Sequence, residues 1–367
     1  MFIGMAGPSC SGKRTVANWL VTVHGFTLLS LKKDDQYVQN ALHFDSAEDV
    51  LLYVTKNWLD NFVTYEIYNN TVLEVYRKRP FFLLASVDAP ITIRYQRCVE
   101  RCQSNGQVYP TLEQFVTEND RLLFQKIHPT NMEISELYRN DRGKSFGSII
   151  TEEKYTAIYN LIANADLNII NSFLTTQAFF TYLHSLDITN QERLRPSWDT
   201  YFIHLSELAA KRSNCMKRKV GCILVRNNRI ISTGYNGTPR GLKNCNQGGC
   251  DRCNDAAPCG TGLDKCLCLH AEENALLEAG KERGDGCILY CNTCPCLGCT
   301  VKLIQIGVKE VVYNRSYRMD EKTSQLLKSA GVKLRQHSLP AKTFEVRLQE
   351  VEVNTEQVVV AEDDVMM

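Results

Sequence analysis

Four residues late in the sequence have the types and spacing of a reactive metal site. His270 is followed two positions later by Glu272, and Cys296 and Cys299 are three positions apart. Two thiols with that spacing at the start of a helix face the same way, and the positive end of the helix favours the thiolate form. Three protein ligands leave one tetrahedral position for water, as a catalytic zinc requires. We therefore predict zinc ligands at His270, Cys296 and Cys299 and a proton shuttle at Glu272.

The two motifs are stronger together than apart. A lone C-x-x-C is often a structural half-site or a redox pair, and a lone H-x-E is common by chance. Together, as H-x-E and P-C-x-x-C, they form the signature of zinc-dependent deaminases. Because zinc lowers the pKa of water towards ~7, we expect attack on carbon 4 of a cytosine ring. Glu272 would carry the proton to ring nitrogen 3 and then supply one to the departing ammonia.

The cysteines are concentrated in the second half of the chain. Of the 16 cysteines, only Cys10, Cys98 and Cys102 precede residue 195, and the other 13 lie between Cys215 and Cys299. The N-terminus has no basic segment typical of a secretory signal. In a reducing compartment, cysteines at this density favour metal binding over disulfides.

One segment has more cysteines than the catalytic site needs. Residues 237–269 are rich in Gly, Asn and Cys and have no periodicity. Ordering a loop of that length loses much conformational entropy, which a cross-link such as a bound metal would offset. We predict a second, structural zinc here, and the favoured ligand set is Cys245, Cys250, Cys253 and Cys266. Cys259 and Cys268 leave other sets open, and the alternative is that some of these residues are simply buried thiols.

Strands and helices alternate around these residues. Ser197 is a plausible N-cap for a helix through Ala210, and Asn227-Asn228 joins two strands in a hairpin. The further elements that we expect are strands at 220–225, 229–234, 288–291, 308–313 and 332–335, and helices at 270–279, 296–306 and 324–330. Gly280 and Gly307 are expected to end the first two of these helices.

The N-terminal region has a different character. Buried strands at 2–5 and 81–87 and a helix at 14–23 predict a parallel α/β layer. The loop from Gly7 to Thr15 nearly fits the phosphate loop G-x-x-x-x-G-K-[ST], with Gly7, Gly12 and Lys13 in place. However, Arg14 occupies the position of the hydroxyl that binds Mg²⁺. We predict that the loop can cradle a phosphate weakly, if at all, and does not support phosphoryl transfer.

These patterns divide the chain into four parts. We expect a degenerate P-loop kinase-like domain at 1–185, a polar linker at 186–195, a zinc domain at 196–340 and an acidic tail at 341–367. Lysine and arginine number 42 against 41 acids, so the net charge of +1 gives no hint of nucleic acid. No apolar run approaches the ~18 residues of a membrane span. We expect a soluble protein of the cytoplasm, and the nucleus is an alternative location.

Six ordered blocks resemble deoxycytidylate (dCMP) deaminases. They are RPSWDTYF (195–202), AAKRSNC (209–215), VGCILV (220–225), TGYNGTPRG (233–241), CLHAEENALLEAG (268–280) and TCPCLGC (293–299). They cover about residues 195 to 338, and the fungal members are most similar because they too carry an N-terminal extension. The resemblance implies the cytidine-deaminase fold, an α/β/α sandwich with a mixed sheet. It also implies deamination of dCMP to dUMP and ammonia for thymidylate synthesis, in an oligomer activated by dCTP and inhibited by dTTP.

The resemblance also implies roles for three further residues. Asn236, in the Gly-Tyr-Asn-Gly turn, resembles the residue that hydrogen-bonds the sugar or base, although a plain turn asparagine is the alternative. Tyr317 and Arg318 resemble a mobile tyrosine and a phosphate-binding arginine, although a solvated arginine after a strand is the alternative.

The N-terminal region has a resemblance of its own. Val87-Asp88-Ala89-Pro90 followed by Arg94, Arg97 and Arg101 resembles the strand end and lid arginines of small-metabolite P-loop kinases, or these arginines form a solvated helix face. Residues 164–172 resemble the late strand of dephospho-coenzyme-A kinases.

Three other functions share parts of these patterns. The first is a cytidine or adenosine deaminase of nucleic acid, which the basic residues Lys211, Arg212, Lys217, Arg218 and Lys219 favour. The second is a bifunctional kinase–deaminase. The third is a zinc module without activity, which the intact Glu272 argues against.

Overall fold

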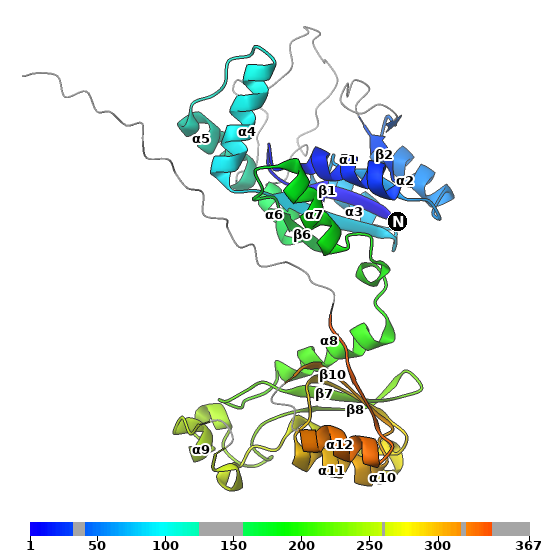
Figure 1. Ribbon diagram of the computed structural model, residues 1–367, viewed down its shortest axis with the longest axis vertical. Coiled ribbons are helices and arrows are strands. Elements are labelled where there is room, and N and C mark those ends of the chain that lie inside the picture. Colours follow the sequence, from blue (N-terminus) through cyan, green and yellow to red (C-terminus); the bar gives the residue numbers. More distant parts are fainter. Residues whose placement is uncertain (32–40, 125–156, 259–260, 317–320, 340–367) are drawn as a thin grey trace, which may run out of the picture. The chain divides into compact units, whose positions relative to one another are not determined.

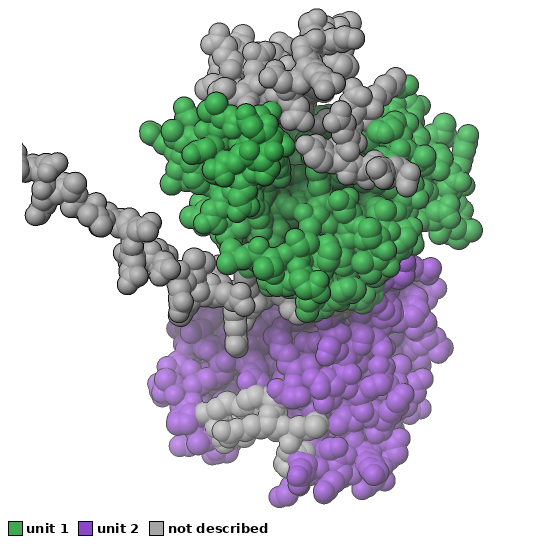
Figure 2. All heavy atoms as spheres, turned by 45° about the horizontal axis from the view of Figure 1, so that its top comes forward, with its two compact units in different colours: residues 1–190, 341–367 green, residues 191–340 purple. Residues whose placement is uncertain are grey.

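The computed structural model describes residues 1–31, 41–124, 157–258, 261–316 and 321–339. Figure 1 shows the elements and Figure 2 the two compact units into which they divide, within residues 1–190 and 191–340. Among the described residues, no helix is long and apolar enough to cross a membrane.

The first unit is built on a parallel sheet of six strands in the order β3-β2-β4-β1-β5-β6. The strands are β1 (Phe2–Ala6), β2 (Thr27–Ser30), β3 (Leu42–His43), β4 (Phe62–Thr64), β5 (Phe82–Asp88) and β6 (Leu167–Ile170). The helices are α1 (Lys13–His24), α2 (Ala47–Lys56), α3 (Asn70–Arg77), α4 (Ile91–Ser104), α5 (Leu112–Phe124), α6 (Ile158–Ala163) and α7 (Thr176–Leu186).

Strand β1, at the centre of the sheet, shows why the parallel α/β layer could be predicted from the sequence. All five residues of β1 are buried, and β1 pairs with β4 on one side and β5 on the other. A strand covered on both faces must be continuously apolar, and FIGMA meets that demand. The predicted strands at 2–5 and 81–87 and the predicted helix at 14–23 are confirmed as β1, β5 and α1.

The second unit is a mixed sheet of five strands in the order β11-β10-β9-β7-β8. The strands are β7 (Gly221–Arg226), β8 (Arg229–Tyr235), β9 (Ile288–Thr293), β10 (Glu310–Arg315) and β11 (Lys333–Gln336). The α-helices are α8 (Trp198–Ala210), α9 (Asp251–Asn254), α10 (Ala271–Gly284), α11 (Leu297–Ile306) and α12 (Glu321–Ser329). Short 3-10 helices lie at η3 (Gln191–Arg193), η4 (Cys245–Gln247) and η5 (Leu263–Lys265).

Helices cover both faces of this sheet (Figure 1). Alternate residues of β7 point to opposite sides. Ile223 and Val225 join Phe202 and Ile203 of α8 in one core cluster. The other face is covered by α10, α11 and α12, whose cluster includes Leu224. The predicted α/β/α sandwich with a mixed sheet is therefore confirmed.

Two predicted local features are also present in this unit. The Ser197 side chain caps α8 by accepting a hydrogen bond from the Thr200 amide. Asn227 and Asn228 both have positive φ, 52° and 57°, as a two-residue type I′ hairpin turn requires.

Gly280 differs from the prediction. It has φ 67°, but it produces a kink within α10, which continues to Gly284, instead of ending the helix.

A close approach of backbones sets the position of α10. A Cβ on Gly234 of β8 would lie 2.0 Å from the carbonyl oxygen of Ala271, in the first turn of α10. Only glycine lets the strand and the helix pack this closely. The packing holds the start of α10, and hence His270, against the sheet.

Candidate active site and metal centres

The predicted zinc ligands converge at the starts of two helices. His270 is the N-cap of α10, and Cys296 is the N-cap of α11, three residues after the end of β9. The His270 Nδ1 atom lies 3.4 Å from the Cys296 sulfur and 3.3 Å from the Cys299 sulfur. A tetrahedral zinc would place its nitrogen and sulfur ligand atoms about 3.6 Å apart. The three side chains therefore fit one zinc ion.

Hydrogen bonds among these groups polarise the site. The Cys299 thiol donates to Cys296 and, with His270, lowers the pKa of Cys296 to about 4 against the opposing effect of burial. The same contacts raise the pKa of Cys299 above its ordinary value and raise the pKa of His270 to about 9. The protons that the three groups share are those that a bound metal displaces.

Glu272 is the buried acid of the site. Only 3% of the residue is exposed, and burial raises the pKa of its carboxyl group to about 6. Cys296 and His270, by contrast, are exposed, so the site opens to solvent on one side. A carboxyl group with a pKa near neutrality can both accept and return a proton.

Glu273 supports His270 and was not singled out from the sequence. Its side chain accepts a hydrogen bond of 2.7 Å from the His270 amide, which completes a capping box, and it pairs with Lys302 of α11. The signal for it was available, because an acid three residues after a helix N-cap is the capping-box pattern.

The Asn236 side chain is bonded to the segment that precedes β7. Its Oδ1 atom accepts hydrogen bonds from Ser213 Oγ at 2.7 Å and from the Val220 amide at 2.8 Å. Its Nδ2 atom donates to the Arg218 carbonyl at 2.8 Å. Within the part of the chain that the structure describes, the second N–H of this buried amide has no hydrogen-bond partner. The other predicted substrate residues, Tyr317 and Arg318, lie outside the described residues.

The structure divides the four thiols predicted to share a structural metal between two groups. One group is Cys215, Cys245, Cys253 and Cys268, and the other is Cys250, Cys253, Cys266 and Cys268. Cys245 and Cys266 never occur in the same group, so the predicted set needs correction. The ligand set favoured from the sequence omitted Cys268, which lies two residues before His270. It also omitted Cys215, which lies far upstream of the loop. Cys259 lies outside the described residues.

Comparison with known proteins agrees with this geometry. The model of the cytidine and deoxycytidylate deaminase zinc-binding region matches residues 196–315. The deoxycytidylate deaminase of Schizosaccharomyces pombe is 46% identical over 345 residues, which cover 92% of this chain and 98% of that protein. The chain belongs to the deoxycytidylate deaminase family. The Saccharomyces cerevisiae deoxycytidylate deaminase is 43% identical over 342 residues, covering 92% of this chain and 97% of that protein.

The family likeness includes the first unit. The two yeast deoxycytidylate deaminases match almost the whole chain, whereas the dCMP deaminase of cyanophage S-TIM5, solved with dCMP and dUMP, covers 39% of it. The match to that structure has 33% sequence identity, includes 98% of the cyanophage chain and has a TM-score of 0.32.

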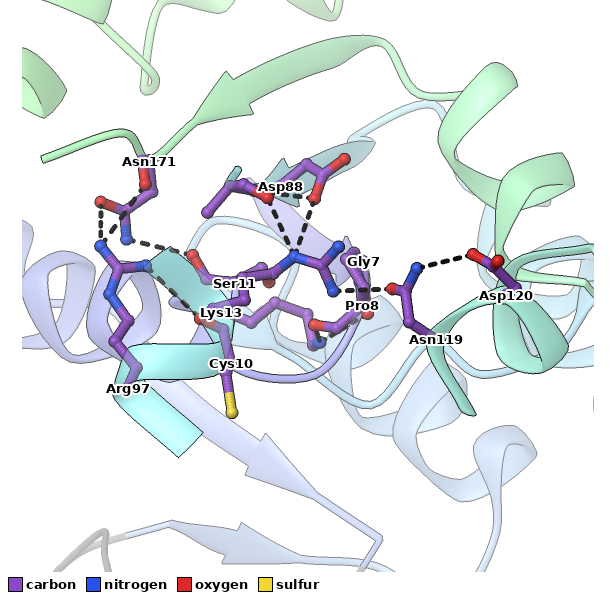
Figure 3. A network of polar contacts seen from close by, with 12 residues as sticks. Gly7, Pro8, Cys10, Ser11, Lys13, Asp88, Arg97, Asn119, Asp120 and Asn171 are labelled. Atoms are coloured by element: carbon purple, nitrogen blue, oxygen red, sulfur yellow. Dashed lines mark hydrogen bonds and ion pairs between the residues drawn. The ribbon is translucent and has the colours of Figure 1, made fainter. Parts of the chain in front are cut away.

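In this deoxycytidylate deaminase family member, the predicted phosphate loop lies between β1 and α1 (Figure 3). Lys13 Nζ donates to the carbonyl oxygens of Gly7 at 2.6 Å and Pro8 at 2.8 Å. Gly7 and Gly12 have φ of 150° and 104°, and Gly12 is the N-cap of α1. The loop thus closes on its own lysine, and burial lowers the pKa of Lys13 to about 8.

Two of the three predicted lid arginines are tied to this region instead of forming a solvated face. Arg94 is 4% exposed and donates to the Ala89 carbonyl and to Asn119 Oδ1. Arg97 donates to Asn171 Oδ1 at 3.1 Å and to the Phe173 carbonyl at 2.8 Å. The third, Arg101, lines a cavity of about 780 Å³ beside the loop. Arg14, Thr15 and Arg94 line the same cavity.

Proposed function

We propose that this protein is a zinc-dependent hydrolase that converts dCMP to dUMP and ammonia. The observation that carries the proposal is the convergence of His270, Cys296 and Cys299 within 4.8 Å, with the carboxyl group of Glu272 buried next to them. Three ligands and a non-ligand acid are what a zinc deaminase needs. The yeast relatives named as deoxycytidylate deaminases support dCMP as the substrate.

The residues divide the chemical work as follows. His270, through Nδ1, and the sulfurs of Cys296 and Cys299 would hold the zinc ion. When bound, zinc supplies Lewis acidity that lowers the pKa of a water molecule towards about 7. Glu272 takes a proton from the attacking water and passes it to ring nitrogen 3. It then takes the proton of the hydroxyl group added at carbon 4 and passes it to the amine, which leaves as ammonia while the carbonyl forms. Its pKa of about 6 suits both steps near neutral pH.

Other residues would recognise the nucleotide. The second N–H of the Asn236 amide would donate to the sugar or base, Arg318 would bind the phosphate, and Tyr317 would be a mobile residue of the substrate site. The proposal includes a homo-oligomer activated by dCTP and inhibited by dTTP, and zinc in the cysteine-rich segment as a structural element.

A substrate panel tests the proposal. Freshly purified full-length protein is assayed for ammonia release from dCMP, CMP, deoxycytidine and cytidine, with and without dCTP or dTTP. Single-stranded DNA and tRNA serve as substrates of the alternative class. We expect a preference for dCMP that a chelator abolishes and added zinc restores. Deamination of the polymers without activity on dCMP would contradict the proposal.

We further propose that the first unit is a P-loop kinase-like domain whose loop binds phosphate groups without transferring them. The cations Lys13, Arg94 and Arg97 surround the loop, and their pKa values are lowered by burial. An anion would offset that cost of burial. Arg14 stands where a Mg²⁺-binding hydroxyl would be needed and lies 5.4 Å from the Tyr65 ring centre.

A further inference from the structure

The segment between β8 and His270 has a core made of cysteines. Among its described residues, the helices are η4, α9 and η5, which have at most four residues each. The buried cluster at its centre consists of Cys245, Cys250, Cys253 and Cys268, with Cys215 and Cys266 packed against them. Thiols therefore take the place that larger apolar side chains hold in an ordinary core.

These six sulfurs form two overlapping groups of four. In each group the sulfurs lie within 4.8 Å of one another. Cys253 and Cys268 belong to both groups. Two residues therefore lie where the ligand sets of two ions would meet.

The separations are those of zinc ligands. Cys266 lies 4.0 Å from Cys250 and 3.8 Å from Cys253, sulfur to sulfur. A disulfide bond would be about 2.05 Å long. Four sulfurs around a tetrahedral zinc, at about 2.3 Å from the metal, are about 3.8 Å apart.

We propose that this six-cysteine cluster binds two zinc ions through bridging thiolates. Cys215 and Cys245 would be terminal ligands of the first ion, Cys250 and Cys266 of the second, and Cys253 and Cys268 would bridge both. Each ion then has four sulfur ligands, as structural zinc sites do, and six cysteines holding two zinc ions are a known protein module. Binding releases six thiol protons to solvent.

A single ion would leave part of this cluster unexplained. One ion in the first group would leave the Cys250 and Cys266 sulfurs 4.0 Å apart without a metal, and Cys250 is fully buried. One ion in the second group would leave Cys245, which is also fully buried, without a metal. Two ions use every thiol of both groups.

Neighbouring donors suit the charge of such a cluster. Six thiolates and two Zn²⁺ ions carry a net charge of −2. Arg252 directs a guanidinium nitrogen at the Cys266 sulfur, at 3.8 Å, and the Met216 amide donates to the Cys245 sulfur at 3.4 Å. Donors of this kind stabilise thiolate in preference to thiol.

Metal content and cadmium NMR test the proposal on the full chain. We expect three zinc ions per wild-type chain, of which His270→Ala loses only the catalytic one. In protein loaded with ¹¹³Cd, we expect two of the three signals to show mutual scalar coupling through the shared sulfurs. Two zinc ions per wild-type chain, or three cadmium signals without coupling, would overturn the proposal. Failure of the catalytic proposal would instead appear as lost dCMP turnover with the coupled pair intact.

Variants separate bridging from terminal ligands. Cys253→Ser should lose both cluster ions, whereas Cys215→Ser should lose one. Cys102→Ser is the matched control, since Cys102 is a half-buried thiol of α4 outside both groups, and should keep all three. Because the ligand variants can misfold, the coupling in the wild-type protein decides. Equal metal loss in all three variants would contradict the assignment.

Discussion

Glu273 accepts a hydrogen bond of 2.7 Å from the backbone N–H of His270, the N-cap of α10. The same carboxylate pairs with Lys302 of α11. One acid therefore ties together the two helices that carry the proposed ligands of the catalytic zinc. Outer contacts of this kind orient metal ligands and commonly change affinity by about 10- to 100-fold.

We therefore expect Glu273→Ala to weaken zinc binding about tenfold or more and to destabilise the protein by about 1 kcal/mol through the lost cap. Competition with a zinc chelator and thermal unfolding would measure the two effects. Glu278→Ala is the control, because Glu278 is exposed on the same helix. Unchanged zinc affinity in Glu273→Ala would show that the cap does not position His270.

Glu272→Gln should separate metal binding from catalysis. Glutamine keeps the shape of the side chain but cannot carry a proton, so we expect the rate constant for dCMP deamination to fall about 100- to 10,000-fold. Zinc content should stay at the wild-type value. Because burial already favours the neutral form of Glu272, the variant should be no less stable at pH 7. Turnover near the wild-type rate would refute the proton-shuttle role.

Asp199 should make the stability of the second unit depend on pH. It accepts hydrogen bonds from Arg335 at 2.6 and 3.1 Å and from Tyr290 at 2.8 Å, linking α8 to β11 and β9. Burial alone would raise the pKa of Asp199, but these bonds outweigh it and lower the pKa. A lowered pKa in the folded state means that the stabilisation is full above the unfolded value of about 3.9 and is lost as pH falls through the folded value.

We expect Asp199→Asn to destabilise the protein by about 1 kcal/mol at pH 7, because the network is partly exposed, and by progressively less in acid. Urea unfolding of both proteins between pH 3 and pH 7 would show this convergence. Glu207→Gln, which removes an exposed pair with Arg315, is the control and should change little. A destabilisation that does not vary with pH would contradict the assignment.

How far the sequence could predict these sites depends on how local each signal is. His270, Cys296 and Cys299 are grouped by two short motifs at helix starts, so the sequence brings them together before any tertiary contact is known. The hairpin at Asn227-Asn228 is local in the same sense, since both residues must adopt positive φ.

The cysteine cluster is assembled by the fold instead. Cys215 precedes the hairpin and Cys268 lies at the end of the loop, beside the isolated bridge between Gly237 and Leu269 that closes the loop at its base, yet their sulfurs belong to one group. All thiols look alike in a sequence, so spacing could pick out Cys250 and Cys253 but not their partners. The kink at Gly280 was missed for a related reason, because positive φ alone does not say whether a helix stops or resumes.

The loop between β1 and α1 should not support phosphoryl transfer. Full-length protein incubated with ATP, Mg²⁺ and a panel of nucleosides, nucleotides and dephospho-coenzyme A should yield no phosphorylated product by mass spectrometry. Phosphoryl transfer needs a metal held against the outer phosphates, and Arg14 adds positive charge where its hydroxyl ligand should be. Thr15, which lines the cavity, follows one position too late in the motif.

Weak binding of phosphate groups is a separate outcome, since Lys13 must first leave the carbonyls of Gly7 and Pro8. Any ATP binding measured by calorimetry should weaken at least several-fold in Lys13→Ala, because the lysine supplies the charge nearest the loop. Lys56→Ala, at an exposed lysine of α2, is the control and should leave it unchanged. Phosphoryl transfer that Lys13→Ala abolishes would make the protein bifunctional and overturn the prediction, since it would mean that Thr15 or another group organises the metal despite Arg14.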